Sequence, residues 1–179
     1  MMTTKLGSRL GLPISPDQAG QPRLELCLVS QAAIITDMKA LAATSLDNNW
    51  LYFFAENRRD DYSQADLDIS GWIPLERLSD WAVTSSSQAG ADWFRRDVTL
   101  EGAGFCANYL LHIDRVPQDI QVYVNGVLVG EAEGGQPFHC DVTDYVAMGR
   151  NVVAMQLVCV FDACGGGFGR VYLQPVRCD

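Results

Sequence analysis

Three short segments of the chain contain residues whose types and spacing could do chemistry. Asp66 to Gly71 opens like a calcium-binding loop, but such a loop needs a glutamate at its twelfth position, where this chain has Arg77. The glycines from Gly165 to Gly169 could cradle a phosphate, but Arg170 follows them, and the Lys-Ser/Thr pair of a phosphate loop is absent. The serines at 85–87 lack the sharp turn pattern that presents a catalytic serine. None of the three segments predicts a calcium, phosphate or nucleophile site.

The cysteines and histidines form no recognisable metal-binding pattern. No two cysteines have C-x-x-C spacing, and His112 and His139 are far apart in the sequence, so we expect no metal and no cofactor. Six cysteines could form three bridges, but no export signal is recognised at the start of the chain. We therefore expect reduced thiols in a cytoplasmic protein. The cysteines are Cys27, Cys106, Cys140, Cys159, Cys164 and Cys178.

The charge balance excludes one class of partner. The chain has 22 Asp and Glu against 13 Lys and Arg, a net charge of −9. A phosphate backbone requires a basic face, so nucleic acid is not a predicted partner. No apolar run approaches the roughly 18 residues that cross a bilayer, so no membrane partner is predicted either. Any two of the 22 acids could meet in space as a catalytic pair, and no local pattern selects one.

The elements that must position these residues are mostly strands. Phe94, Val98 and Leu100 share one face of a predicted strand, and Trp93 and Arg95 lie on the other. An apolar run on both faces at residues 151–161 predicts a central strand covered on both sides. The predicted strands are residues 49–55, 92–100, 107–113, 120–124, 127–131, 137–142, 151–161 and 171–176.

Turns and loops connect these strands. Asn125-Gly126 between two alternating runs predicts a two-residue hairpin turn, because both central residues of a type I′ turn have positive φ. Residues 57–70 are polar and acidic, which predicts a loop, and residues 31–45 have the spacing of one short helix. The pattern predicts an all-β protein, an antiparallel β-sandwich at 47–179 preceded by an extension with a short helix at 1–46. We expect the core to include Val122, Val124, Leu111, Trp81 and Val152 or Val153, with Trp72 also filling the sandwich.

Several motifs in the strand region occur in a familiar order: Asp68–Trp72, Asp80-Trp81, Trp93–Arg96, Val122–Gly130, Gly134–Phe138, Asp141–Thr143, Gly149–Ala154 and Gly166–Leu173. Together they resemble the sugar-binding domain at the N-terminus of glycoside hydrolase family 2 enzymes. The resemblance covers about residues 47–177 and implies the galactose-binding-like jelly roll. In that family the catalytic glutamates belong to a later (β/α)₈ barrel, for which we expect no room in this chain. The resemblance therefore implies a module without catalytic residues.

Three residues are candidates for ligand binding. A sugar site needs an exposed aromatic ring and polar groups for hydroxyls, and Trp93 and Arg95 share a strand face that could supply both. The alternative is that a neighbouring strand or the N-terminal helix covers Trp93. Asp162 lies beside the glycine loop, where some family members place an acid near the barrel's active site. The alternative for Asp162 is a solvated loop carboxylate.

These observations leave three hypotheses for function. The first is a non-catalytic module that binds carbohydrate, or binds a protein or a second copy of itself through an exposed sheet face. The second is a domain or subunit of a larger glycosidase whose barrel is on another chain or lost. The third is an unrelated enzyme on a jelly roll, for which no catalytic constellation is found. Which sugar would be bound is not predicted.

Overall fold

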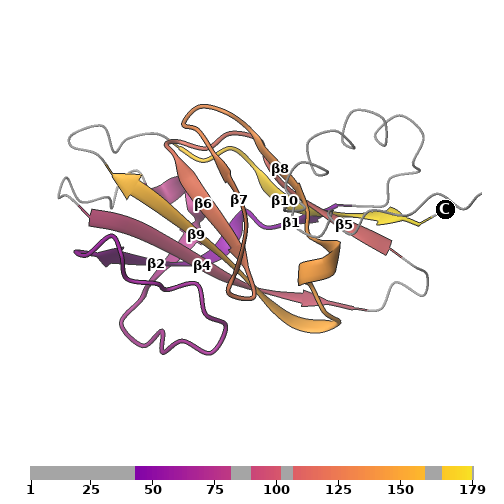
Figure 1. The fold of residues 1–179 in the computed structure, drawn as a ribbon, viewed down its shortest axis with the longest axis horizontal. Helices are drawn as coiled ribbons and strands as arrows, with labels where there is room; N and C mark the ends of the chain where they lie inside the picture. The colour runs from indigo at the N-terminus through magenta and orange to yellow at the C-terminus, as the bar shows by residue number, and fades with distance from the viewer. Residues whose placement is uncertain (1–42, 82–89, 102–106, 160–166, 179) are drawn as a thin grey trace, which may run out of the picture.

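Two antiparallel sheets lie face to face in the computed structural model (Figure 1), which describes residues 43–81, 90–101, 107–159 and 167–178, apart from the side chains of 158, 159 and 177. The four-stranded sheet has the order β1-β10-β5-β8, and the six-stranded sheet has the order β3-β2-β4-β9-β6-β7. The strands are β1 Thr44–Ser45, β2 Asn48–Ala55, β3 Ile73–Arg77, β4 Gly90–Leu100, β5 Ala107–Ile113, β6 Ile120–Val124, β7 Val127–Ala132, β8 Phe138–Asp141, β9 Gly149–Cys159 and β10 Val171–Arg177, with short 3₁₀ helices η1 Leu78–Asp80 and η2 Thr143–Tyr145. The predicted all-β sandwich is confirmed.

Most predicted strands agree with the structure to within two residues at each end. The predictions at 107–113 and 120–124 coincide with β5 and β6, and β9 lies between β4 and β6, as expected for a covered central strand. The strands β1 and β3 were not predicted. The predicted helix at 31–45 lies outside the described residues except at its end, where Thr44 and Ser45 form β1.

The core lies between the two sheets and is rich in aromatic rings. Trp81 and Phe94 are fully buried and meet edge to face, with ring centroids 5.5 Å apart. Phe168, from the segment before β10, meets Phe94 with centroids 5.3 Å apart. The predicted core positions are confirmed, since each is at most 4% exposed: Val122, Val124, Leu111, Trp81, Val152 and Val153.

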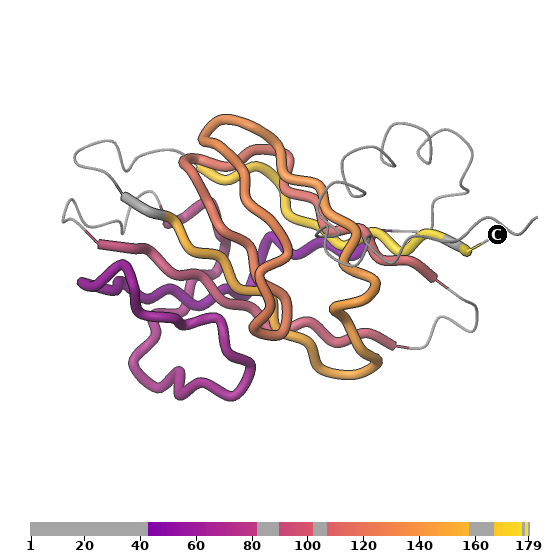
Figure 2. The backbone as a smooth tube through the Cα atoms, in the orientation of Figure 1, coloured from indigo at the N-terminus to yellow at the C-terminus, as the bar shows by residue number. Residues whose placement is uncertain are grey.

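A second apolar cluster covers the outer face of the six-stranded sheet. The chain from residue 56 to 72 makes a long loop beside β2 and β4 (Figure 2), and its side chains pack on that face. Tyr62 from this loop contacts Trp93 edge to face at 5.8 Å, and Trp72 stacks on Phe53 at 5.5 Å. The expectation that Trp72 fills the space between the sheets is therefore wrong. Its ring packs in the outer cluster because Trp72 lies at the end of the loop, just before β3, and not at a strand position that faces the core.

The hairpin between β6 and β7 is fixed by a network of two asparagines. Asn125 and Gly126 have φ of 51° and 84°, which confirms the predicted two-residue turn. The Asn125 side chain accepts a hydrogen bond from the Val152 amide at 2.8 Å and donates one to Asn151 Oδ1 at 2.9 Å. Asn151 is 1% exposed and also accepts from the Ala147 amide. The two asparagines of the family-like motifs thus join the hairpin to β9.

One cysteine expectation is corrected by the structure. Cys140 is buried, and Cys178 is disulfide-bonded. The six thiols are therefore not all reduced, and the argument from reduced thiols to a cytoplasmic location no longer holds. That location stays a prediction. No helix in the described part of the chain is long and apolar enough to cross a membrane.

Candidate functional site

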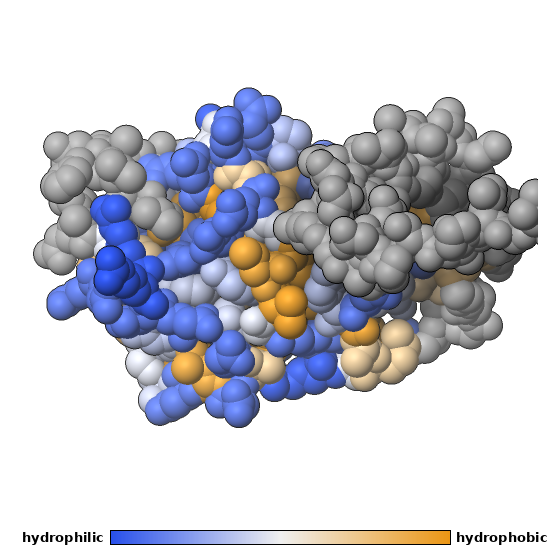
Figure 3. Space-filling model, viewed as in Figure 1, coloured by the Kyte–Doolittle hydropathy of each residue, from blue (hydrophilic) through white to orange (hydrophobic). Residues whose placement is uncertain are grey.

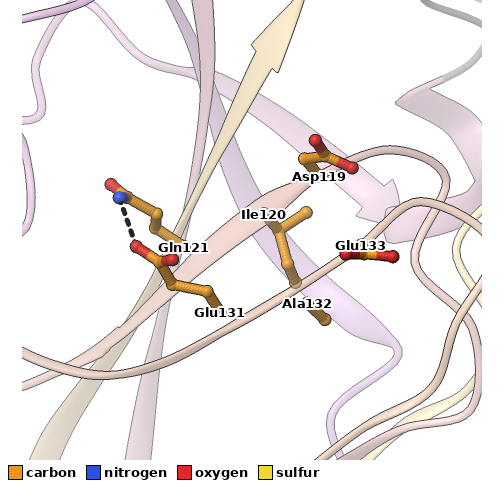
Figure 4. Close-up of a pocket in the computed structure, with 6 residues that line it drawn as sticks. All are labelled: Asp119, Ile120, Gln121, Glu131, Ala132 and Glu133. Carbon is orange, nitrogen blue, oxygen red and sulfur yellow. Dashed lines mark hydrogen bonds between the residues drawn. The ribbon is translucent and has the colours of Figure 1, made fainter.

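An open pocket of about 450 Å³ lies at the β6–β7 end of the six-stranded sheet (Figure 4). Its lining comes from the start of β6 and the end of β7, which lie side by side in antiparallel register. Ile120, 2% exposed, belongs to the core between the sheets, while the carboxylates are exposed to solvent. The lining residues are Asp119, Ile120, Gln121, Glu131, Ala132 and Glu133.

A chain of hydrogen bonds runs along one wall of the pocket. Gln121 lies opposite Glu131, and its Nε2 donates to Glu131 Oε1 at 2.7 Å. The Tyr123 hydroxyl donates to Gln121 Oε1 at 2.8 Å. Burial raises the pKa of the Tyr123 hydroxyl, and the nearby carboxylates of Asp61 and Glu131 raise it further. Tyr123 therefore stays a hydrogen-bond donor at neutral pH, and this fixes the orientation of the Gln121 amide.

A β-bulge creates the pairing of Gln121 with Glu131. Near the turn the partners are Val124 with Val127 and Tyr123 with Leu128, and the register shifts by one residue beyond Tyr123. Without that shift Gln121 would face Gly130, and Glu131 would point to the other face of the sheet. The bulge therefore places both polar side chains on the same face.

The turn after β7 closes the other side of the pocket. Asp119 Oδ1 accepts a hydrogen bond from the Gly134 amide at 2.9 Å, which ties the turn to the start of β6. A Cβ at Gly134 would lie 2.9 Å from the Gln118 Cα, so this close approach requires glycine. Gly135 has φ of 82°, which also favours glycine.

The polar side chains of the pocket can exchange hydrogen bonds with a ligand. The carboxylates of the pocket accept hydrogen bonds and the Gln121 amide both donates and accepts, which suits neutral hydroxyl groups. No lining residue is a cation, a histidine or a cysteine. Among the described residues no three His, Cys, Asp or Glu side chains gather as a metal site. The geometry fits the binding of a polyhydroxylated ligand.

The structure places the predicted ligand residues Trp93 and Arg95 in the interior. Each is 1% exposed, because the loop at 56–72 covers their face of β4. The Arg95 guanidinium donates to the carbonyl oxygens of Gln64 and Ala65 and so holds the loop down. Neither side chain can reach a sugar in this structure, which corrects that assignment. Asp162 lies outside the described residues, so its role stays a prediction.

Sequence comparisons relate the chain to glycosidases. No protein-family model matches it. A protein of Formosa agariphila that carries the name β-glucuronidase is 24% identical over 128 residues, which is 64% of this chain and 12% of that protein. A β-galactosidase of Thermoanaerobacter pseudethanolicus is 34% identical over 68 residues, which is 36% of this chain and 9% of that protein. The chain thus spans about a tenth of the length of these relatives.

Solved structures share the fold. A glycosyl hydrolase family 2 member from Bacteroides cellulosilyticus matches 75% of this chain with a TM-score of 0.63 and 20% identity, and the match covers 20% of that protein. A β-glucuronidase from Bifidobacterium dentium, solved with coumarin-3-O-glucuronide, matches 80% of this chain with a TM-score of 0.63 and 17% identity, and the match covers 31% of that protein. The predicted resemblance is confirmed: the described sandwich resembles a domain of family 2 glycoside hydrolases.

Proposed function

We propose that this chain is a non-catalytic carbohydrate-binding module whose site is the pocket lined by Gln121 and Glu131. The observation that carries the proposal is the oriented hydrogen-bond chain Tyr123–Gln121–Glu131 at an open pocket. The Gln121 amide is already oriented beside the Glu131 carboxylate. The two groups can therefore bind two neighbouring hydroxyls of a sugar ring with little loss of side-chain entropy. The relation to glycosidases supports a sugar as the ligand.

The pocket favours neutral sugars over acidic ones. Its carboxylates come from Asp119, Glu131 and Glu133, and no cation lines it. A uronate would bring a further negative charge into this group, and like charges in close contact are unfavourable. We therefore expect neutral β-linked sugars to bind in preference to glucuronides, although relatives are named for β-glucuronidase activity.

A glycan array with the purified full chain tests the proposal, followed by calorimetry on the best ligand. Gln121→Ala should weaken binding roughly tenfold, which corresponds to about 1.4 kcal/mol, the size of one good hydrogen bond. The matched control is Glu76→Gln, an exposed position on β3 at the opposite edge of the same sheet. Glycan binding that is equal in Gln121→Ala and the wild type would place the site elsewhere.

A second candidate function is a docking domain of a larger glycosidase. It is favoured by the small share of its relatives that the chain spans and by exposed apolar side chains near the β6–β7 turn. Val127 and Leu128 are 49% and 45% exposed, and an apolar patch lies over this hairpin (Figure 3). Co-purification with a family 2 barrel protein, lost in Leu128→Glu and retained in Gln121→Ala, would favour this function over sugar binding.

A further inference from the structure

The outer face of the six-stranded sheet has a covered part and an open part. Side chains of the loop at 56–72 pack over β2 and β4, which lie on one side of the central strand β9. On the other side of β9 lie β6 and the edge strand β7, where Leu128 is 45% exposed and Glu131 is also exposed. The half-buried Tyr123 of β6 lies between the covered rings and this open part.

The strand register gathers four side chains on the open part. Tyr123 pairs with Leu128 across β6 and β7, and Gln121 pairs with Glu131. Paired residues share a face of a sheet, and so do residues two positions apart in a strand. Gln121 and Glu131 point toward each other and are joined by their hydrogen bond (Figure 4). An aromatic ring and an oriented amide–carboxylate pair are thus neighbours, roughly 6.5–7 Å apart along β6.

Contacts on two sides fix the Tyr123 ring. Its centroid lies 5.6 Å from that of Trp93, and the two ring planes are 36° apart. Ala154 of β9 pairs with Tyr123, and its methyl group leaves room for the two rings to meet. The Tyr123 hydroxyl donates to Gln121 Oε1 at 2.8 Å. The ring is therefore oriented before a ligand arrives, and stacking on it costs little side-chain entropy.

A sugar ring has an apolar and a polar surface, and the open part of the sheet offers a partner for each. In a pyranose whose hydroxyls are all equatorial, the hydroxyls form a polar rim and axial C–H groups cover both faces. The face of an aromatic ring carries negative π density, which attracts C–H groups. The rim hydroxyls of a sugar stacked on Tyr123 would meet the Gln121 amide and the Glu131 carboxylate, which exchange hydrogen bonds with neutral hydroxyls. Leu128 extends the apolar surface beside the ring.

We propose that Tyr123 is the stacking residue of the sugar site and that the site takes neutral pyranosides with equatorial hydroxyls, such as β-glucosides. The proposal rests on the proposed function, because both use the Gln121–Glu131 pair. Tyr123 supplies the partly exposed aromatic ring that a sugar site needs, in place of Trp93, which the loop covers. A glucuronide has the same ring and can stack in the same way, but its carboxylate would meet that of Glu131.

NMR titration of the full chain with methyl β-D-glucopyranoside tests the stacking. An aromatic ring against the sugar face shifts the axial C–H protons of the sugar upfield. We expect such shifts in the bound state, together with nuclear Overhauser contacts between these protons and a tyrosine ring. Tyr123→Leu should remove the shifts and weaken binding roughly tenfold. Tyr123→Phe should keep the shifts and weaken binding by roughly a factor of three, because it loses only the hydroxyl that orients Gln121.

Controls separate stacking from a change of fold. Tyr172→Leu replaces a half-buried tyrosine of β10, in the other sheet, and should bind the sugar as the wild type does. Circular dichroism and the melting temperature report whether each variant folds. If Tyr123→Leu does not fold, the shifts in the wild type and in Tyr123→Phe still decide the question, since they require only the ring.

The failure of the stacking role and the failure of the proposed function give different results. Sugar binding without upfield shifts, or with equal affinity in the wild type and Tyr123→Leu, would overturn the stacking role. If Gln121→Ala still weakens that binding, the proposed function stands without it. Binding of other neutral glycans but not of methyl β-D-glucopyranoside would overturn the assigned sugar class. A chain that binds no neutral glycan of an array would overturn both proposals.

Discussion

A few polar side chains in the interior decide how the sandwich responds to pH and to substitution. Asp92 of β4 is fully buried and accepts a hydrogen bond from the Tyr52 hydroxyl at 2.7 Å. Asn151 is almost fully buried and satisfies backbone groups of the turn before β9. Burial of a polar group is tolerated only where such partners are present. Both residues therefore lead to quantitative predictions.

Asp92 should make the protein less stable as pH rises. Burial raises the pKa of its carboxyl group in the folded state. The folded chain thus holds this proton more tightly than the unfolded chain, so the contribution is fully present below the unfolded pKa and is lost as pH rises through the folded pKa. In urea unfolding from pH 4 to 7, Asp92→Asn should remove this loss, so that the variant gains stability relative to the wild type as pH rises.

Asp68 provides a control, because its carboxyl group should change stability with pH in the direction opposite to Asp92. Hydrogen bonds from the Ser70 amide and hydroxyl lower the pKa of its carboxyl, so its contribution is present above the unfolded pKa and is lost as pH falls. Asp68→Asn should therefore lose stability relative to the wild type as pH rises. Parallel pH profiles for the two variants would contradict both assignments.

Asn151→Ala should destabilise the fold by about 2–3 kcal/mol. The substitution removes the acceptor of the Ala147 amide and Asn125 Nδ2, and the donor to the Ala147 and Gly149 carbonyls. Chemical denaturation measures the change, and the exposed Gln136→Ala, whose side chain makes no such bonds, should stay within about 0.5 kcal/mol of the wild type. An Asn151→Ala variant as stable as the wild type would mean that water replaces these hydrogen bonds without loss of stability.

At the scale of elements, the alternation of apolar and polar residues predicted those strands and turns that depend only on a few neighbouring residues. The strands β5 and β6 and the Asn125-Gly126 turn follow from patterns that span a few residues. β3 was missed because it is an edge strand with Pro74 inside it, and only Leu75 of its five residues is buried. Its pattern therefore lacks the apolar alternation that identifies a strand.

The candidate site depends on features that the alternation of apolar and polar residues did not predict. The bulge that pairs Gln121 with Glu131 has its extra residue in β7 beside Gly130, and an isolated glycine in a strand is a signal for a bulge that the alternation pattern did not use. Trp93 has the same strand pattern whether its face is open or covered, and what covers it is the loop at 56–72. The sequence predicted that loop from its polarity, which says nothing about where its Tyr62 and Trp72 rings pack.

Gly126→Val should destabilise the β6–β7 hairpin by roughly 1 kcal/mol or more, since a β-branched residue strongly resists a positive φ. Its Cβ would also lie 3.1 Å from the Gln64 side chain. Thermal unfolding should show a lower melting temperature. Gly71→Ala is the control, because Gly71 has open space around its Cβ position and no positive φ. An equal effect of both substitutions would show that the turn conformation is not what matters.

At the scale of the whole molecule, the acids of the described residues differ in burial, and this bears on whether the sandwich could hydrolyse a glycoside. Retaining hydrolysis needs two carboxyl groups about 5 Å apart on either side of a bound sugar, one of them kept protonated by its surroundings. Among the described residues the fully buried carboxyl is that of Asp92, which accepts a hydrogen bond from Tyr52. The pocket acids Asp119, Glu131 and Glu133 are exposed to solvent.

We therefore expect no turnover of nitrophenyl β-galactosides, β-glucuronides or β-mannosides by the purified chain. A general acid is usually a buried carboxyl group, whereas the pocket acids Asp119, Glu131 and Glu133 are exposed. The assay should include Glu131→Gln and Asp162→Asn, so that a contaminating host glycosidase, which neither substitution affects, is recognised. Turnover that either substitution abolishes, while the folded spectrum is unchanged, would identify the chain as an enzyme and that acid as part of its site. A mock preparation from the same host, made without this chain, identifies the contaminant, because turnover equal to that of the mock preparation is not due to this chain.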